Sequence, residues 1–247
     1  MAIFYKSFLK PVLDLFSSST SKGRTTGASA TATSRRSSTP SKGTRKSAAT
    51  SKTKYDYKKF IEKEEINELP PLDFNGEIIQ VETLEGAKRA LKILSKEPVL
   101  GFDTETRPAF TKGESYDPAL LQLATQTQAF IFRLKFYEPP KEMWDLLSNP
   151  NVKKVGVGIY DDLLALKKLK KFEPAGFVDI ADEAKKLGFE SFSLRALLAI
   201  FTGTRLLKGA RRTNWERKDL TNAQIKYAAL DAVAGLLIHE KISELSR

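Results

Sequence analysis

Two carboxylates on one face of a short apolar strand constrain this chain more than any other feature. Residues 98–106 are largely apolar, but Asp103 and Glu105 stand there, separated by one residue. Because side chains alternate between the two faces of a strand, both carboxylates lie on the same face. An ionised carboxylate that leaves water needs a partner, and a metal cation is the strongest one. The pattern therefore predicts a divalent-metal site built on a buried strand.

The composition narrows the kind of metal. The chain contains no cysteine and one histidine, His239. These counts exclude disulfide scaffolds, thiolate zinc sites and sites that need two or three histidines. Aspartate and glutamate remain as the strong ligands, and all-oxygen coordination favours Mg²⁺, Mn²⁺ or Ca²⁺. We expect His239 to be a surface residue near the end of the last helix.

The positive charge is concentrated at the start of the chain. Residues 1–56 carry a net charge of +9, whereas residues 57–247 carry only +2. Residues 17–54 contain almost no large apolar side chain, so we predict a disordered basic tail over 1–56. The sequence leaves two roles open for this tail: an arm that binds phosphates, or a plain linker. One folded domain is expected over 57–247.

The sequence also bears on the surroundings of the protein. No apolar run approaches the roughly 18 residues that a membrane-spanning helix requires, so none is predicted. We expect a cytoplasmic, intracellular protein. Organelle targeting or membrane attachment by the N-terminal residues is a minor alternative.

Hydrophobic periodicity predicts an α/β fold with a mixed sheet. A Thr-Gln-Thr-Gln turn over 125–128 predicts a hairpin between two of its strands, and Thr221 with Gln224 forms a capping-box pattern before the last helix. Strands are predicted over 77–81, 98–106, 119–124, 129–134, 154–159 and 176–179. Helices are predicted over 83–95, 142–147, 162–170, 180–187, 194–201 and 222–243.

Further acids stand in apolar surroundings. Asp231 is the only charged residue of the segment 227–238, and Tyr227 precedes it by one helical turn on the same face. Asp161 and Asp162 follow a predicted strand, where an aspartate is usually a helix N-cap. Taken alone, each of these acids also has a structural explanation: a helix N-cap for Asp161 or Asp162, and a hydrogen bond to a loop backbone for Asp231. Together, four carboxylates can hold two Mg²⁺ ions, an arrangement that serves phosphoryl transfer.

At these residues the sequence resembles the DEDDy branch of the DEDD exonucleases, which includes ribonuclease D and the Werner-type exonuclease domain. The matching motifs are Phe102-Asp103-Thr104-Glu105, the segment from Gly156 to Asp162, and Tyr227 with Asp231. The segment from Leu207 to Trp215 is similar to the Werner-type group. The resemblance covers about residues 77–243.

The resemblance implies an RNase H-like mixed sheet of five to six strands flanked by helices, and 3′→5′ hydrolysis of nucleic acid. Asp103, Glu105, Asp162 and Asp231 would bind two divalent ions, Mg²⁺ or Mn²⁺, and Tyr227 would position the attacking water. Asp162 is chosen over Asp161 because the family's acid immediately precedes the apolar part of its helix. DNA is the favoured substrate. The alternatives are a ribonuclease D-type enzyme acting on RNA ends and a catalytically silent nucleic-acid-binding module.

Substrate contacts are predicted in two loops. Lys208, Arg211 and Arg212 would contact phosphates, and Trp215 would either stack on a base or anchor the loop in the core. Arg107, Phe110 and Lys112 are further candidates that follow the first motif. Three other residues receive structural roles: Gln122 is expected to form a structural hydrogen bond, and Ile159 and Tyr160 are expected to pack in the core.

Overall fold

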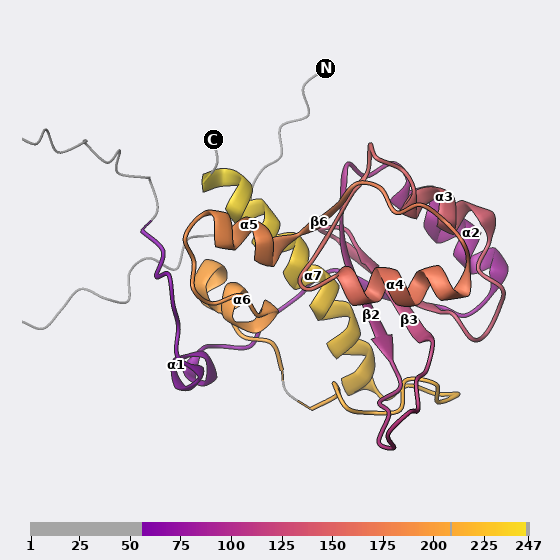
Figure 1. Cartoon of the computed structure of the whole chain (residues 1–247), viewed down its shortest axis with the longest axis horizontal. Coiled ribbons are helices and arrows are strands. Elements are labelled where there is room, and N and C mark those ends of the chain that lie inside the picture. The colour runs from indigo at the N-terminus through magenta and orange to yellow at the C-terminus, as the bar shows by residue number, and fades with distance from the viewer. Residues whose placement is uncertain (1–55, 208, 246–247) are drawn as a thin grey trace, which may run out of the picture. The chain divides into compact units, whose positions relative to one another are not determined.

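The computed structural model describes residues 56–207 and 209–245, so the predictions for the basic tail and for Lys208 lie outside the described residues. A six-stranded mixed sheet, in the order β1-β4-β3-β2-β5-β6, forms the centre of this part of the chain (Figure 1). β2 pairs antiparallel with β3 and β3 with β4, while the outer pairs are parallel. The strands are β1 (Glu77–Val81), β2 (Val99–Thr106), β3 (Pro118–Ala124), β4 (Gln128–Arg133), β5 (Lys153–Gly156) and β6 (Phe177–Asp179). The mixed α/β fold and the hairpin between β3 and β4 are confirmed.

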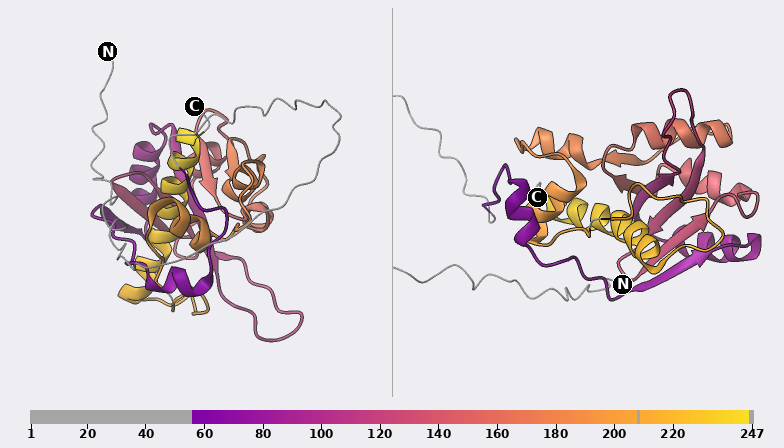
Figure 2. Two further views of the ribbon diagram at one scale, coloured as in Figure 1. Left: turned by 90° about the vertical axis from the view of Figure 1, so that its left-hand side faces the viewer. Right: turned by 90° about the horizontal axis from the view of Figure 1, so that it is seen from below.

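Helices cover both faces of this sheet, and each face has its own apolar core (Figures 1 and 2). One face is packed by α5, α6 and α7, the other by α2, α3 and α4. The short helix α1, which periodicity does not predict, packs against α6. The helices are α1 (Lys63–Glu68), α2 (Leu84–Leu94), α3 (Lys141–Leu147), α4 (Tyr160–Leu169), α5 (Ile180–Lys186), α6 (Leu194–Thr202) and α7 (Asn222–Leu245). None of the helices within residues 56–207 and 209–245 combines the length and hydropathy needed to cross a bilayer.

The helix α7 begins where the capping box predicts it. The Gln224 amide N–H donates to the Thr221 hydroxyl at 3.2 Å, and the Thr221 amide N–H donates back to Gln224 Oε1 at 3.0 Å. Further along, α7 lies directly on β2: a Cβ placed on Gly101 would lie 2.0 Å from the Ala232 carbonyl oxygen. Only glycine allows this close approach. The approach brings the face of α7 that carries Asp231 against the strand that carries Asp103 and Glu105.

The junction between β5 and α4 differs from the prediction. β5 ends at Gly156 instead of continuing to residue 159, and α4 begins at Tyr160. Gly158 has a positive φ of 72°, and Asp179 at the end of β6 accepts hydrogen bonds from the amides of Gly158 and Ile159. The carboxylate of Asp179 therefore holds the turn at the start of α4. Sequence reasoning missed this role because the two segments meet only in the sheet.

Candidate active site

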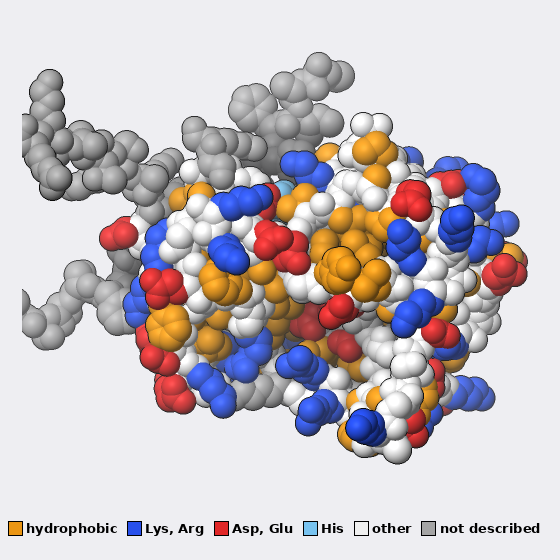
Figure 3. All heavy atoms as spheres, in the orientation of Figure 1, with side chains coloured by type: hydrophobic (Ala, Val, Ile, Leu, Met, Phe, Trp, Pro, Cys, Tyr) orange, Lys and Arg blue, Asp and Glu red, His pale blue; other side chains and the backbone are white. Residues whose placement is uncertain are grey.

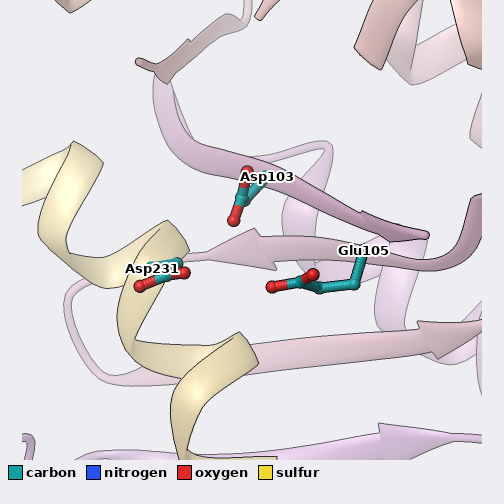
Figure 4. Close-up of side chains that lie close together, drawn as sticks. All are labelled: Asp103, Glu105 and Asp231. Carbon is teal, nitrogen blue, oxygen red and sulfur yellow. The ribbon is translucent and has the colours of Figure 1, made fainter. Parts of the chain in front are cut away.

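Three carboxylates meet between β2 and α7. Asp103 and Glu105 project from β2 and Asp231 from α7, and each offers an oxygen that lies within 4.8 Å of the others (Figure 4). Glu105 is 8% exposed and Asp231 is 6% exposed. The strand prediction for the pair is confirmed, since both carboxylates point to the α7 face of the sheet while Phe102 packs in the opposite core. The strand and the helix hold three acids together in a largely buried place.

This proximity is electrostatically unfavourable while the acids are ionised. Burial raises the pKa of Glu105 to about 9, with the charges of Asp231 and Asp162 adding to the effect. Burial raises the pKa of Asp231 to about 7, although its hydrogen bond with Tyr227 acts in the opposite direction. The pKa of Asp103 is raised well above its usual value by burial and by the three neighbouring acids. Burial and mutual repulsion therefore favour the protonated forms of these acids, and a bound cation would favour the ionised forms.

The donor set of the cluster fits a hard divalent cation. All three residues offer carboxylate oxygens, the ligands that Mg²⁺ and Mn²⁺ prefer. Asp231 Oδ1 is buried and has no hydrogen-bond partner among the described residues. Buried polar atoms are normally satisfied, so this oxygen is available to a ligand that the site is built to hold. Asp103, Glu105 and Asp231 are the residues that could hold a metal.

Tyr227 lies one helical turn before Asp231 and is hydrogen-bonded to it. Burial and the charges of Asp231 and Glu105 raise the pKa of the Tyr227 hydroxyl. The phenol therefore keeps its proton, and it can both donate and accept a hydrogen bond beside the acids. The Trp215 ring packs 6.0 Å from the Tyr227 ring, measured between centroids, and supports it from the loop.

Asp162 lies beside the triad without joining it. It stands in the first turn of α4, and its Oδ1 accepts a short hydrogen bond from the Thr104 hydroxyl. Burial raises its pKa to about 6, and its charge in turn raises the pKa of Asp103 and of Glu105. The N-cap of α4 is Ile159, so the interpretation of Asp161 or Asp162 as a cap is wrong. Asp161 is exposed.

The loop before α7 carries both confirmed and corrected predictions. Trp215 is 0% exposed, so its ring anchors the loop, and the prediction that it stacks on a base is wrong. Arg211 is the cation whose charge lowers the pKa of Glu105 and Asp231, whereas the sequence alone named it together with Arg212 and did not distinguish the two. Two arginines of equal chemistry stand side by side in the sequence, and only the path of the loop separates them. Arg212 is exposed.

The loop is tied to the sheet by a buried arginine. Arg133 at the end of β4 is 1% exposed, and its guanidinium donates to the carbonyl oxygens of Arg217 and Lys218. Gln224 Nε2 also donates to the Thr213 hydroxyl at 2.9 Å and to the Asn214 carbonyl at 3.1 Å. These bonds give the segment that carries Arg211 a defined position.

Of the three candidate substrate contacts that follow β2, Arg107 contacts other side chains, whereas Phe110 and Lys112 are exposed. Arg107 forms an ion pair with Glu216 at 3.5 Å and lies over the Tyr116 ring at 4.6 Å. Phe110 is 82% exposed, and Lys112 is exposed as well. Arg107 therefore links the loop after β2 to the loop before α7.

Three structural expectations are wrong. Tyr160 is 70% exposed instead of packed, because it lies on the face of α4 that is turned away from the sheet. His239 is buried instead of exposed and contacts Glu183 of α5 at 3.2 Å. Gln122 is buried opposite Asp103, but neither polar atom of its side chain has a hydrogen-bond partner within the described part of the chain.

Comparisons with known proteins agree with the geometry. A family model described as 3′-5′ exonuclease matches residues 78–246. The mouse bifunctional 3′-5′ exonuclease/ATP-dependent helicase WRN is 34% identical over 187 residues, covering 72% of this chain and 13% of the relative. Ribonuclease D of Gluconacetobacter diazotrophicus is 28% identical over 172 residues, which cover 67% of this chain and 42% of the relative. The chain thus spans less than half of either relative.

The fold is also found among solved structures. Escherichia coli RNase D superimposes with a TM-score of 0.63 at 20% sequence identity, over 71% of this chain and 46% of that one. At this level of identity the likeness concerns the arrangement of sheet and helices.

Proposed function

This chain belongs to the 3′-5′ exonuclease family, and from this premise we propose that it hydrolyses DNA from the 3′ end with two divalent metal ions held by its acid cluster. We propose that residues 57–247 form the exonuclease domain. The family depends on divalent metal, and the acidic triad is present in this chain. The number of ions and the identity of the metal, Mg²⁺ or Mn²⁺, belong to the proposal.

One observation carries the proposal: three buried carboxylates lie within 4.8 Å of one another, and one of their oxygens has no partner among the described residues. Such a cluster is costly without a cation, because burial and mutual repulsion both disfavour the charged forms. Asp162, which borders the triad and raises the pKa of two of its members, is the fourth proposed ligand.

The residues around the cluster have separate proposed roles. Bound divalent ions would supply positive charge to the scissile phosphate and make a water more nucleophilic. Tyr227 would orient that water, since its protonated hydroxyl donates one hydrogen bond and accepts another. Arg211 would contact a phosphate oxygen, because it is the cation whose charge reaches the acids.

The substrate is proposed from two different likenesses. The loop before α7 resembles the Werner-type group, and the mouse relative is more similar to this chain than the bacterial ribonuclease D. Both observations favour DNA. The second candidate function is RNA 3′-end processing, which the likeness to enzymes named ribonuclease D favours.

Labelled oligonucleotides test this proposal. The full chain is given 5′-labelled single-stranded DNA, duplex DNA with a recessed 3′ end, and RNA of the same sequence, with Mg²⁺ or Mn²⁺ and with EDTA. We expect stepwise shortening of DNA with metal and none with EDTA, and the Asp103→Asn protein serves as the control for a contaminating nuclease. Shortening of RNA alone would contradict the DNA assignment, and no shortening at all would leave only a binding module.

The proposed role of Arg211 has a matched control next to it. Arg211→Gln should reduce kcat/KM roughly tenfold, the effect of losing one charge-assisted phosphate contact. Arg212→Gln, which removes the same charge one residue further along the same loop, should change kcat/KM by less than about threefold. Equal losses in the two variants would show that the loop contributes only a diffuse positive charge.

A further inference from the structure

The outer face of α4 carries an ordered stripe of side chains. Tyr160 and Leu164 are four residues apart, and they are 70% and 45% exposed. Lys167 and Lys168 follow one helical turn later and are also exposed. At 3.6 residues per turn these four residues share one side of the helix. The opposite side, with Asp162 and Leu166, faces the sheet, so the stripe faces solvent.

The stripe begins beside the acid cluster. Tyr160 stands two residues before Asp162, which is hydrogen-bonded to Thr104 on the strand of Asp103 and Glu105. In Figure 1, α4 lies in front of the sheet next to β2. Figure 3, in the same orientation, shows hydrophobic side chains over the start of α4, acidic ones below them, and Lys and Arg side chains further along the helix. A strand of nucleic acid that leaves the acids along α4 would meet apolar groups first and cations next.

The side chains of the stripe have little to bind within the protein. Lys167 is 3.7 Å from Glu173, an ion pair whose acid is 84% exposed and therefore weakly held. Lys168 has no carboxylate within ion-pair distance among residues 56–207 and 209–245. Tyr160 is 70% exposed and Leu164 is 45% exposed, so apolar surface of both side chains lies in water. Both halves of the stripe are thus open to a ligand.

We propose that this stripe binds the nucleic-acid strand being digested, on the 5′ side of the scissile bond. A nucleobase stacks on Tyr160 against Leu164, and the next phosphates contact Lys167 and Lys168. Aromatic platforms followed by cations are how proteins hold single strands without reading their sequence. From Tyr160 to Lys168 the helix rises about 12 Å, which matches roughly three to four stacked nucleotides. The proposal rests on the proposed exonuclease function and names a second, separate part of its substrate path.

Binding measured without cleavage tests the stripe independently of catalysis. In EDTA, the anisotropy of a labelled 20-nucleotide single strand is followed with the full-length protein and its variants. Lys167→Glu/Lys168→Glu should weaken binding about tenfold or more and lower the dependence of log K on log salt by about 1.4. Lys185→Glu/Lys186→Glu is the matched control, because it reverses two adjacent lysines in the last turn of α5 and should change binding less than about twofold.

The apolar half has its own variants. Tyr160→Ala should weaken binding roughly fivefold or more, whereas Tyr160→Phe should bind like the unmodified protein, because stacking requires only the ring. With a dinucleotide, which is too short to reach the lysines, Lys167→Glu/Lys168→Glu should have the same KM as the unmodified protein.

The outcomes separate the two proposals. If the lysine variants and their α5 controls bind alike, or if Tyr160→Ala and Tyr160→Phe bind alike, the stripe is an ordinary solvated face and the inference is overturned. If the protein cleaves no substrate but the stripe variants still lose binding selectively, the exonuclease proposal fails while the stripe stands as a nucleic-acid surface. Selective loss for duplexes and not for single strands would overturn the assignment to the digested strand.

Discussion

Two neighbouring strands of the sheet, β2 and β5, bury charge in opposite ways. On β5, Lys154 is 0% exposed, and its ammonium group donates to the carbonyl oxygens of Leu146, Asn149 and Val152 at 3.2, 2.8 and 2.8 Å. On β2, Asp103 and Glu105 face Asp231, whose charge raises the pKa of both of them. The register of the two strands places Leu100 of β2 beside Lys154.

The difference distinguishes a buried charge that stabilises the fold, Lys154, from buried charges that can bind a ligand, the acid cluster. A buried cation with three carbonyl acceptors uses all of its donors, so it needs nothing from outside the fold. The acids have more acceptor oxygens than donors, and Asp231 Oδ1 has none within the described residues. A cluster of this kind lowers the stability of the free protein and gains its partner when a cation binds.

Replacing an acid should have the largest effect and should separate function from stability. Asp103→Asn is expected to lower kcat by at least about a thousandfold, roughly 4 kcal/mol, because it removes a ligand from the proposed metal site. The free energy of unfolding should stay the same or rise, since one buried repulsion disappears. Steady-state nuclease kinetics and urea unfolding measure the two quantities. Asp161→Asn, at an exposed neighbouring acid, is the control and should change neither.

Removing the lysine should produce the reverse result. Lys154→Met removes the ammonium that donates to three carbonyl oxygens and leaves the Val152 carbonyl without this donor, so it is expected to lower the free energy of unfolding by about 3 kcal/mol. The specific activity of the folded fraction should stay within about threefold, because Lys154 lies outside the acid cluster. Lys153→Met, at the exposed position next to it, should be neutral in urea unfolding. A catalytic loss in Lys154→Met without a loss of stability would contradict the comparison.

The free energy of unfolding should also depend on pH because of the acid cluster, and this effect should be smaller than those of the two substitutions. Burial raises the pKa of Asp162 to about 6, of Asp231 to about 7 and of Glu105 to about 9, all above their values in an unfolded chain. Between about pH 4 and pH 9 the unfolded state therefore binds fewer protons than the folded state, and stability falls as pH rises. Divalent metal competes with these protons, so the stabilisation by metal should grow over the same range, by roughly 2 kcal/mol.

Thermal unfolding with EDTA and with Mn²⁺, at several pH values, measures both trends. The melting temperature in EDTA should fall toward high pH, and the gain from Mn²⁺ should increase. In Glu105→Gln the fall in EDTA should be smaller, because the carboxyl group whose pKa burial raises to about 9 is gone. A gain from Mn²⁺ that does not change with pH would show that the acids do not release protons to the metal.

Features that depend on neighbours in the chain were predictable. The Thr221–Gln224 capping box marks the start of α7 correctly, because capping is a contact between residues three apart. The alternation along residues 98–106 correctly puts Asp103 and Glu105 on one face. The spacing of Tyr227 and Asp231 correctly brings them together on one turn of helix.

The sequence by itself thus determined the α/β pattern, the acids and the chemistry that they offer. The tertiary structure alone decided which arginine lowers the pKa of the acids and that Asp162 stands beside the triad. It also decided that Asp179 holds the start of α4, and that Lys154 and His239 are buried while Tyr160 is exposed. The physical reason is the range of the interactions. Periodicity and capping act within a few residues, whereas burial and charge proximity are set by segments such as β2, α4 and α7 that meet only in the folded chain.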